Sequence, residues 1–344
     1  MTTPGPRLDP PADSSLPPLA ELLDTARVVA IPMRVRFRGL LVREALLLEG
    51  PEGWGEFGPF QEYDDAEASS WLRAGIEAAW QGFPDPVRLR IPVNATVPAL
   101  APPRVGAVLA RFGAVSAVKV KVAEREQTLA DDVARVAEVR RLLPQAALRV
   151  DANGGWSEGE AVTALTALAE FSLEYAEQPV PDIAGLRRVR NELRRRQLPV
   201  LIAADESVRR EQDPLRVARE DAADLLVIKA APLGGVRRAV EIVAQAGLPA
   251  VVSSALDTSV GIRAGVALAA ALPELPYACG LATVSLMDGD VTEQSLVPDD
   301  GTLTVRPVAV SAELLDRYAV PDGRRRWWLD RLERVYAVLA EDVR

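Results

Sequence analysis

The chain of 344 residues contains no histidine and a single cysteine, Cys279. The absence of histidine excludes a histidine general base, a Ser-His-Asp triad and zinc held by imidazole. Acid–base chemistry in this chain must therefore use lysine, carboxylate, tyrosine or the single thiol. One cysteine forms no intrachain disulfide, so we expect a reducing compartment, the cytoplasm.

The chain also lacks a basic excess and a long apolar run. Its formal net charge is −9, which argues against nucleic acid or an anionic membrane as a partner. No apolar stretch approaches the length of a membrane span, and the N-terminal residues do not have the pattern of a secretory signal. The basic and aromatic segment RRRWWLDRLERVYAVL is predicted to form an amphipathic helix that packs Trp327 or Trp328.

The rhythm of the sequence divides the chain into three parts. Residues 1–92 are predicted to form a small α+β domain, with a loose proline-rich lead-in at 1–19, two β-rich runs, a Gly- and aromatic-rich loop at 53–60 and a helix within 64–82. Residues 93–300 alternate strand and helix patterns. Residues 301–344 return to a short strand and helices, which we expect to pack on the first domain.

The middle part is predicted to be a parallel barrel. We expect strands at 93–97, 117–122, 147–152, 173–178, 201–205, 224–230, 250–254 and 277–281, separated by helices such as 160–171 and 236–247. Eight such strands favour a closed barrel over an open doubly wound sheet. No G-x-G-x-x-G follows the first strand, which also disfavours a dinucleotide-binding fold.

A charged position recurs at the ends of consecutive strands. The gaps between successive members are 24 to 30 residues, the length of one strand–helix unit, and the members are Lys121 (in Lys119-x-Lys121), Asp151, Glu177, Asp205 and Lys229. In a barrel these positions meet at the C-terminal mouth. Taken singly, each acid is also consistent with a helix N-cap, and D-A-N-G-G-W alone is typical of a turn, but these interpretations do not explain the common phase.

The three carboxylates predict a metal site. Asp151, Glu177 and Asp205 would repel one another unless a cation joined them. Oxygen ligands without histidine or cysteine suit a hard ion, so we expect Mg²⁺, with Mn²⁺ as the alternative. Glu206 follows Asp205 directly and is expected to point elsewhere, as a supporting acceptor beside the metal ligands or as a partner of a lysine.

The lysines predict proton transfer. Lys119 and Lys121 share one face of a strand, the barrel interior, unless this is an edge strand with solvated lysines. Burial, the metal and the Lys119 ammonium all favour a neutral Lys121, which is therefore the predicted base. Lys229 comes from the opposite side of the barrel, so a small carboxylate substrate fits between the two lysines.

Further residues are predicted to bind that substrate. Arg149 and Asn153 alternate with Asp151 on one strand face, and Arg149 is expected deeper in the barrel, where it orients a carboxylate. The hydroxyl and backbone groups of SSALDTSVG, with Ser253 and Ser254, are expected to hold a distal carboxylate, and Gly280 of the last strand is added to this set.

The motifs K-x-K, D-A-N, E-Q-P and D-E-S, followed by a late lysine, resemble the enolase superfamily in its muconate-lactonizing subgroup. The resemblance implies a (β/α)7β-type modified TIM barrel with an α+β capping domain built from the N-terminal segment and the C-terminal tail. GWGEFGP resembles a specificity loop of that capping domain.

Within this subgroup, R-V-D-A-N, SSALDTSVG and the compact chain are most similar to the members that dehydrate 2-succinyl-6-hydroxy-2,4-cyclohexadiene-1-carboxylate to o-succinylbenzoate in menaquinone biosynthesis. The resemblance implies that Lys121 removes the α proton and then assists departure of the β-hydroxyl on the same face. It implies that Lys229 and the metal stabilise the enediolate, and that Lys119 tunes Lys121.

Two alternatives use the same residues differently. With Lys121 and Lys229 as paired bases, the enzyme would racemise an N-acylamino acid or epimerise a dipeptide. The capping loops near 36–40 and 54–60 should decide between these activities. A non-catalytic carboxylate-binding protein is the third reading, and the intact lysines and carboxylates argue against it.

Overall fold

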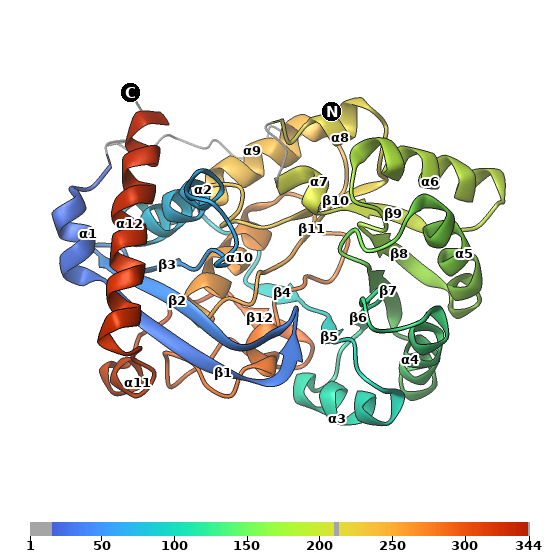
Figure 1. Cartoon of the computed structure of the whole chain (residues 1–344), viewed down its shortest axis with the longest axis horizontal. Helices are drawn as coiled ribbons and strands as arrows, with labels where there is room; N and C mark the ends of the chain where they lie inside the picture. Colours follow the sequence, from blue (N-terminus) through green and yellow to red (C-terminus); the bar gives the residue numbers. More distant parts are fainter. Residues whose placement is uncertain (1–15, 210–212, 343–344) are drawn as a thin grey trace.

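The computed structural model describes residues 16–209 and 213–342, and Figure 1 shows an antiparallel sheet with a long helix on one side and a barrel on the other. Most of the predicted lead-in, residues 1–15, lies outside the described residues. The first described helix, α1 (Leu19–Thr25), begins where the lead-in was expected to end.

The N-terminal half is built on a three-stranded antiparallel sheet of order β1-β2-β3, formed by Arg27–Phe37, Leu40–Gly50 and Gly53–Phe57. The prediction of a loop at 53–60 is therefore wrong for its first five residues, which form a strand paired with β2. Glycine suits this strand because helix α2 (Asp65–Ile76) packs directly on it: a Cβ at Gly55 would lie 2.0 Å from the carbonyl oxygen of Gly75. One π-helical turn, Glu77–Gln81, extends α2.

The C-terminal tail returns to this half. Strand β12 (Thr302–Thr304) pairs with β4 (Arg90–Pro92), and helices α11 (Ala312–Arg317) and α12 (Asp322–Asp342) follow. The Trp328 ring is fully buried, meets Phe57 edge-on with centroids 5.9 Å apart, and donates from Nε1 to Glu44 at 2.8 Å. The predicted C-terminal helix therefore packs mainly through Trp328, whereas Trp327 is only half-buried. The domain limits inferred from the sequence, 1–92, 93–300 and 301–344, stay predictions.

The second half is a parallel sheet of seven strands in the order β11-β10-β9-β8-β7-β6-β5. Its strands, in chain order from β5 to β11, are Ala95–Val97, Ala117–Lys121, Ala147–Asp151, Leu173–Glu177, Leu201–Ala204, Leu225–Ile228 and Ala250–Val252. The helices are α3 (Val105–Leu109), α4 (Leu129–Leu142), α5 (Glu158–Leu168), α6 (Ile183–Arg195), α7 (Glu206–Arg209), α8 (Arg216–Arg219), α9 (Val236–Ala246) and α10 (Ser259–Ala271). Short 3₁₀ turns occupy 102–104, 110–112, 169–171 and 283–286.

The predicted eighth strand, 277–281, is wrong as a strand. The segment instead makes two isolated parallel bridges, Val93 with Cys279 and Ser253 with Gly280. The Cys279 amide donates to Pro92 at 2.7 Å, and the Gly280 amide donates to Val252 at 2.8 Å. The segment therefore joins the two edges of the seven-stranded sheet and closes the ring. Pro276 before it lacks an amide hydrogen, and a 3₁₀ turn follows at 283, so little room is left for a ladder.

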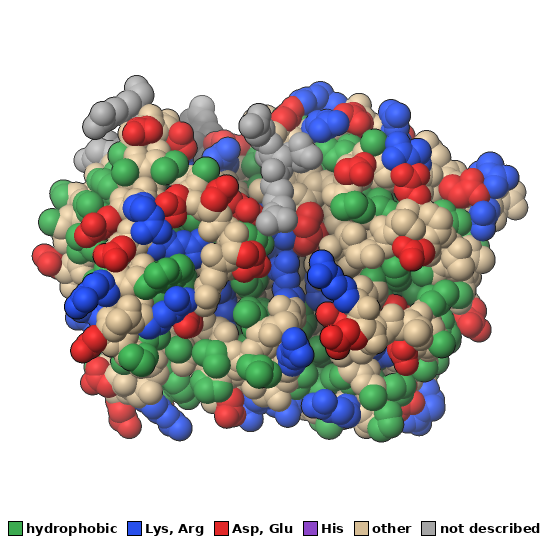
Figure 2. Space-filling view, viewed as in Figure 1, with side chains coloured by type: hydrophobic (Ala, Val, Ile, Leu, Met, Phe, Trp, Pro, Cys, Tyr) green, Lys and Arg blue, Asp and Glu red, His purple; other side chains and the backbone are tan. Residues whose placement is uncertain are grey.

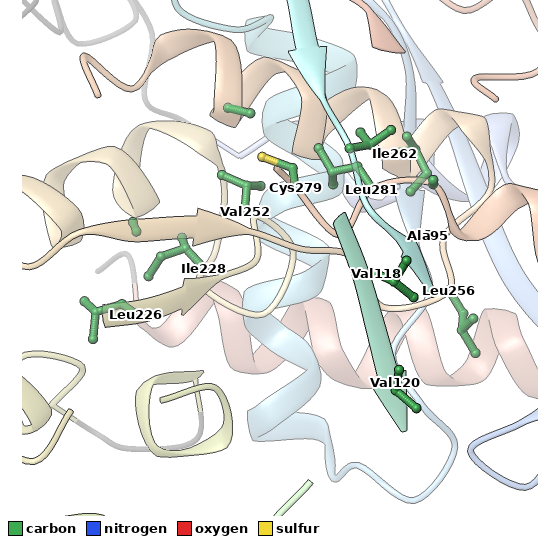
Figure 3. Close-up of a cluster of buried hydrophobic side chains, with 14 of the residues drawn as sticks. Ala95, Val118, Val120, Leu226, Ile228, Val252, Leu256, Ile262, Cys279 and Leu281 are labelled. Carbon is green, nitrogen blue, oxygen red and sulfur yellow. The ribbon is translucent and has the colours of Figure 1, made fainter. Parts of the chain in front are cut away.

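Alternation along the strands separates the two faces of the barrel wall. Figure 3 shows Val118, Val120, Leu226, Ile228 and Val252 in one buried apolar cluster with Cys279. Fully burying a side chain of this size contributes about 1.5–3 kcal/mol each. Burial also raises the pKa of the Cys279 thiol to about 12, so the single cysteine is a core residue rather than a nucleophile.

The opposite face of the same strands lines the barrel interior. A second apolar cluster there contains Tyr175, Ala203, Leu225, Val227 and Val251. Ala203 faces inward, as expected, so Asp205 two residues later has the same phase. Within residues 16–209 and 213–342, none of the helices combines the length and apolarity needed to cross a membrane.

Candidate active site

The chain has only three lysines, and all three line one cavity at the barrel mouth: Lys119, Lys121 and Lys229. Lys119 and Lys121 belong to β6, and Lys229 follows β10. Strands β6 and β10 are each second from an edge of the seven-stranded sheet, with three strands between them. When the ring closes, the two strands lie across the barrel from each other, as the sequence predicts.

The three predicted metal ligands lie on the strands between the lysines. Asp151 ends β7, Glu177 ends β8 and Asp205 follows β9, and each is at most 1% exposed. Asp151 stands in register with Lys121 on one side and with Glu177 on the other. The repeat spacing of the sequence therefore places these side chains together at one level of the barrel.

Each carboxylate is paired with a lysine. Lys121 Nζ lies 2.5 Å from Asp151, and Lys229 Nζ lies 2.5 Å from Asp205. Lys119 Nζ donates to both oxygens of Glu177 at 3.0 Å and lies 3.3 Å from Asp151. Buried carboxylates of this kind require such compensation, since isolated charges are costly inside a protein.

The two lysines of β6 differ electrostatically. Burial lowers the pKa of Lys121, and the neighbouring Lys119 ammonium adds to this effect against the opposing pull of Asp151. At Lys119, burial also acts to lower the pKa, but the carboxylates of Glu177 and Asp151 outweigh it and hold the pKa above its ordinary value. Lys121 therefore gives up its proton more readily than Lys119.

The carboxylates crowd one another. Burial and the negative charge of Asp151 raise the pKa of Glu177 to about 8, and Asp205 adds to the rise. Burial also acts to raise the pKa of Asp151, but Lys121 and Lys119 outweigh it and the pKa falls below its ordinary value. Burial is the larger cause of this raised pKa, and a cation among the three carboxylates would relieve the part that comes from their repulsion.

The donor set fits a hard divalent cation, although the side chains are not arranged around one. In the described part of the chain, no three acidic, histidine or cysteine side chains already stand close enough to surround an ion. The lysine ammoniums lie against the oxygens instead. The three carboxylates, on adjacent parallel strands, offer only oxygen ligands, which is the donor set that a hard cation such as Mg²⁺ prefers.

Four of the five predicted substrate residues line the cavity: Asn153, Ser253, Ser254 and Gly280. The Asn153 amide oxygen accepts from Lys121 Nζ at 2.6 Å. Ser254 Oγ donates to the carbonyl of Gly280 at 2.8 Å and lies 2.9 Å from the Thr283 hydroxyl. Gly280 leaves space that a side chain would fill, because a Cβ there would lie 2.6 Å from Ser253 Oγ.

Arg149, the fifth, lies elsewhere. It stands in register with Lys119, one step deeper in the barrel, and does not line the cavity. Its guanidinium donates to Glu174 at 2.6 Å, to Asn94 at 3.1 Å and to the carbonyl of Ala278 at 2.5 Å. Arg149 thus joins strands across the barrel floor, and we propose no substrate contact for it.

Glu206 lies behind the cavity. Its Oε1 accepts from the Asn153 amide at 3.3 Å and from Arg209 at 2.8 Å. Among the described residues, its charged partner is therefore an arginine rather than a lysine, and no sequence motif pointed to Arg209.

Several further residues line the cavity. Phe37, Arg38, Ala255 and Leu256 lie in segments that the sequence pointed to without naming them individually, and Thr96 and Thr283 were not expected. Phe37 and Arg38 form the tip of the β1–β2 hairpin, and the Phe37 ring lies 5.4 Å from Lys121 Nζ. The basic turn at 36–39 was the feature of the sequence that pointed to these two residues. Thr96 stands in register with Lys119, so strand phase could have pointed to it.

The cavity is nearly filled by these side chains. Its free volume is about 30 Å³, the space of about one water molecule. A ligand larger than a water molecule therefore requires side chains of this cavity to move. Figure 2 shows a furrow between the two halves of the molecule, with Lys or Arg side chains inside it.

A barrel with charged strand ends, closed over by an N-terminal α+β domain, defines the class of protein. The model of the enolase C-terminal domain matches residues 105–309, and that of the enolase N-terminal domain matches residues 28–79. The chain belongs to the enolase superfamily.

Curated relatives narrow the comparison. The chain is 53% identical over 325 residues to the o-succinylbenzoate synthase of Mycobacterium tuberculosis, covering 94% of this chain and 97% of the relative. It is 54% identical to the enzyme of that name from Mycobacterium leprae, over 94% and 95% of the two chains. The counterpart from Mycolicibacterium smegmatis is 52% identical, over 95% and 99%.

Solved structures agree on the fold. A muconate lactonizing enzyme from Pseudomonas fluorescens, complexed with muconolactone, superposes with a TM-score of 0.73 at 21% identity, covering 86% of this chain and 98% of that one. A 2-chloromuconate cycloisomerase from Rhodococcus opacus gives 0.71 at 24% identity over the same shares. These similarities confirm the predicted barrel and capping-domain architecture.

Proposed function

We propose that the chain is a hydro-lyase that converts 2-succinyl-6-hydroxy-2,4-cyclohexadiene-1-carboxylate to o-succinylbenzoate, a step of menaquinone biosynthesis. Identity of 52–54% to o-succinylbenzoate synthases over nearly the full length of both chains carries this assignment. It confirms the activity predicted from the sequence. The roles of individual residues are proposals, supported by the geometry of the site.

Lys121 is the proposed base. Among the three lysines, it combines a lowered pKa with a position on the cavity wall. As a neutral amine it takes the proton α to the substrate carboxylate, and the C–H electron pair forms the enediolate. The resulting ammonium then gives its proton to the β-hydroxyl, the C–O bond breaks, and water leaves as the ring becomes aromatic. One group serving both proton transfers requires loss of water from a single face, a syn elimination.

Lys229 is proposed to remain an ammonium and to stabilise the enediolate from the other side of the cavity. A positive charge placed where negative charge develops lowers the activation barrier for removal of the α proton. The effect is large because a buried site screens charges weakly. Lys119, with a raised pKa, is proposed to stay charged and to favour the neutral form of Lys121.

Enzymes of the enolase superfamily generally depend on a metal ion. Asp151, Glu177 and Asp205 are the proposed ligands of Mg²⁺, or of Mn²⁺ in its place. When bound, the ion would supply positive charge that stabilises the enediolate and so acidifies the α carbon of the substrate.

The opposed lysines also suit a second activity. Lys121 and Lys229 line one cavity from opposite strands of the ring, which is the arrangement that two-base racemisation needs. Racemisation of an N-acylamino acid, or epimerisation of a dipeptide, is therefore the alternative chemistry of the same site.

An ultraviolet assay of the cyclohexadiene substrate tests the proposal. We expect loss of the diene with Mg²⁺, no loss with excess chelator, and at least a hundredfold fall in kcat for Lys121→Ala, about the contribution of a positioned acid–base group. An exposed pair on the outer helices, Arg188 with Glu158, supplies the matched control: Arg188→Ala should leave kcat unchanged.

The assay also separates the alternatives. Failure to consume the diene, together with deuterium exchange at the α carbon of an N-succinylamino acid and its inversion, would move the assignment to racemisation. Carboxylate binding without turnover of either compound, retained in Lys121→Ala, would indicate a binding protein.

A further inference from the structure

The Arg209 side chain, at the end of helix α7, contacts four residues, two from the barrel and two from the N-terminal half. Its Nε lies 3.2 Å from Asp205 Oδ1, and its Nη2 lies 2.8 Å from Glu206 Oε1. Its Nη1 donates to the Tyr63 hydroxyl at 3.1 Å and lies 3.8 Å from Glu67. The side chain is only 4% exposed, so these contacts are made in a poorly screened environment.

One end of this arrangement reaches Lys229. Asp205 accepts from Arg209 through Oδ1 and from Lys229 through Oδ2. Arg209 therefore occupies the oxygen that faces α7 and leaves Oδ2 as the oxygen that faces the cavity lysine. An isolated carboxylate rotates freely about its terminal bond, and this contact removes that freedom.

The other end reaches Lys121. Arg209 holds Glu206, Glu206 accepts from the Asn153 amide at 3.3 Å, and Asn153 accepts from Lys121 Nζ at 2.6 Å. The Asn153 amide group is thereby oriented with its oxygen toward Lys121. Arg209 thus lies at the middle of a chain of polar contacts that runs from one proposed catalytic lysine to the other.

Tyr63 and Glu67 connect this chain to the capping domain. Glu67 lies in the first turn of α2, Tyr63 precedes that helix, and Tyr63 contacts Phe60 with ring centroids 5.5 Å apart. One of the contacts between capping domain and barrel is therefore made by the same guanidinium that orients Asp205.

We propose that Arg209 is a positioning residue, which orients Asp205 and, through Glu206, Asn153 in the geometry needed for metal binding and proton transfer, with the capping domain fixing Arg209 through Tyr63. This inference rests on the proposed function. Arg209 touches neither the cavity nor the reacting atoms, so it acts only through these neighbours.

Arg209→Lys is the decisive variant. Lysine keeps the positive charge but lacks the planar fork that reaches three partners at once. We expect about a 10- to 100-fold weaker Mn²⁺ affinity, the usual loss when a group that orients a metal ligand is removed, and a comparable fall in kcat. Mn²⁺ binding is followed by electron paramagnetic resonance of the free ion, which needs no turnover.

Lysine NMR supplies a second readout. Because the chain holds only three lysines, protein labelled with ¹⁵N at lysine Nζ gives three side-chain signals from the site. Each Arg→Lys variant adds a fourth lysine signal, and comparison with the parent spectrum identifies the three native ones. In Arg209→Lys, the native Lys229 and Lys121 signals should shift. Arg188→Lys, the same change at an exposed bidentate pair with Glu158, should leave Mn²⁺ affinity and all three signals unchanged.

Tyr63→Phe isolates the capping-domain contact. It removes one hydroxyl and leaves the barrel contacts of Arg209 in place, so we expect about a fivefold fall in kcat, the value of one hydrogen bond. This variant also tests the proposal if Arg209→Lys does not fold.

Parent-like kcat, Mn²⁺ affinity and lysine signals in Arg209→Lys would overturn the proposal. So would a loss in Arg209→Gln alone, because that result would assign Arg209 a role through its charge only. Failure of the diene assay in the parent protein would refute the substrate assignment, whereas the Mn²⁺ and NMR results would still decide the role of Arg209.

Discussion

Glu56 of strand β3 is a buried acid whose ionisation should weaken the contact between capping domain and barrel. Its Oε2 accepts from the Thr258 amide at 3.0 Å, the Thr258 hydroxyl at 2.6 Å and the Gly261 amide at 3.1 Å, at the start of helix α10. Burial, followed by the charge of Asp257, raises its pKa from 4.5 to about 8, although Arg43 and these hydrogen bonds oppose the rise.

The sign of the pH dependence follows from this difference. Between pH 4.5 and 8 the folded protein keeps the Glu56 proton while the unfolded chain loses it, so the free energy of unfolding falls as pH rises. A pKa difference of about 3.5 corresponds to at most about 5 kcal/mol, at 1.36 kcal/mol per unit. The contribution is complete below pH 4.5 and lost above pH 8.

Glu56→Gln removes the pH dependence that Glu56 gives to the free energy of unfolding, because glutamine resembles the protonated acid in shape and does not ionise. The gain in unfolding free energy of the variant over the parent should be small at pH 5 and should grow to a few kcal/mol by pH 9, within the limit of about 5 kcal/mol. Urea unfolding followed by tryptophan fluorescence measures both proteins across this range.

Glu192→Gln is the control for this measurement. Glu192 is partly exposed, and hydrogen bonds from Arg195 and Arg196 lower its pKa to about 2, so it is ionised in both states above pH 5. Its substitution should give a difference that does not vary from pH 5 to 9. A constant difference for Glu56→Gln, or one that falls with pH, would refute the argument and identify ionised Glu56 with Arg43 as a stabilising pair.

Three further predictions concern the site and the tail. Lys229→Ala should lower kcat by a factor of about 10²–10³ in the diene assay, as expected when one group that stabilises a developing oxyanion is lost. Gly280→Ala should raise KM more than it lowers kcat, because the new Cβ displaces Ser253 Oγ; equal KM values would show that Ser253 does not meet the substrate. Trp328→Ala should cost about 3–5 kcal/mol in urea unfolding, against much less for the half-buried Trp327→Ala.

The positions of the lysines and carboxylates could be predicted because they depend on local periodicity. Lys119 and Lys121 share a strand face by alternation, and the repeat length places Asp151 beside Lys121 on the next strand. Neither inference needs a distant contact. The same reasoning selected Asp205 over Glu206, and the structure places Asp205 against Lys229.

Predictions that depended on distant parts of the chain were less successful. Arg149 has the predicted phase, but Glu174, Asn94 and Ala278 take up its donors, and Ala278 is 129 residues away. The pattern of one strand does not show that partners elsewhere in the chain, rather than a substrate carboxylate, accept the hydrogen bonds of Arg149. The short final strand failed for a related reason, since its two bridges depend on both edges of the sheet at once.

Arg43 illustrates a determinant that periodicity cannot reveal. It belongs to β2, yet its Nε donates to the carbonyl of Leu256 at 3.0 Å, more than 200 residues later. Leu256 lines the cavity and has a φ of 64°, a left-handed conformation that is rare for leucine and needs such support. The shape of this wall of the cavity is therefore fixed by the capping domain.

The pairing of Asp151 with two lysines connects the state of the base to the state of the site. Asp151 is the nearest group that opposes the lowering of the Lys121 pKa, and it lies within 3.3 Å of Lys119 as well. Whatever takes the Asp151 oxygens away from Lys121 removes the largest opposition to burial and the Lys119 ammonium and leaves only the weaker effect of Glu177, so the neutral amine becomes more favoured. The three lysines therefore neutralise the carboxylates in the closed site, and Lys121 becomes competent as a base when that pairing is broken.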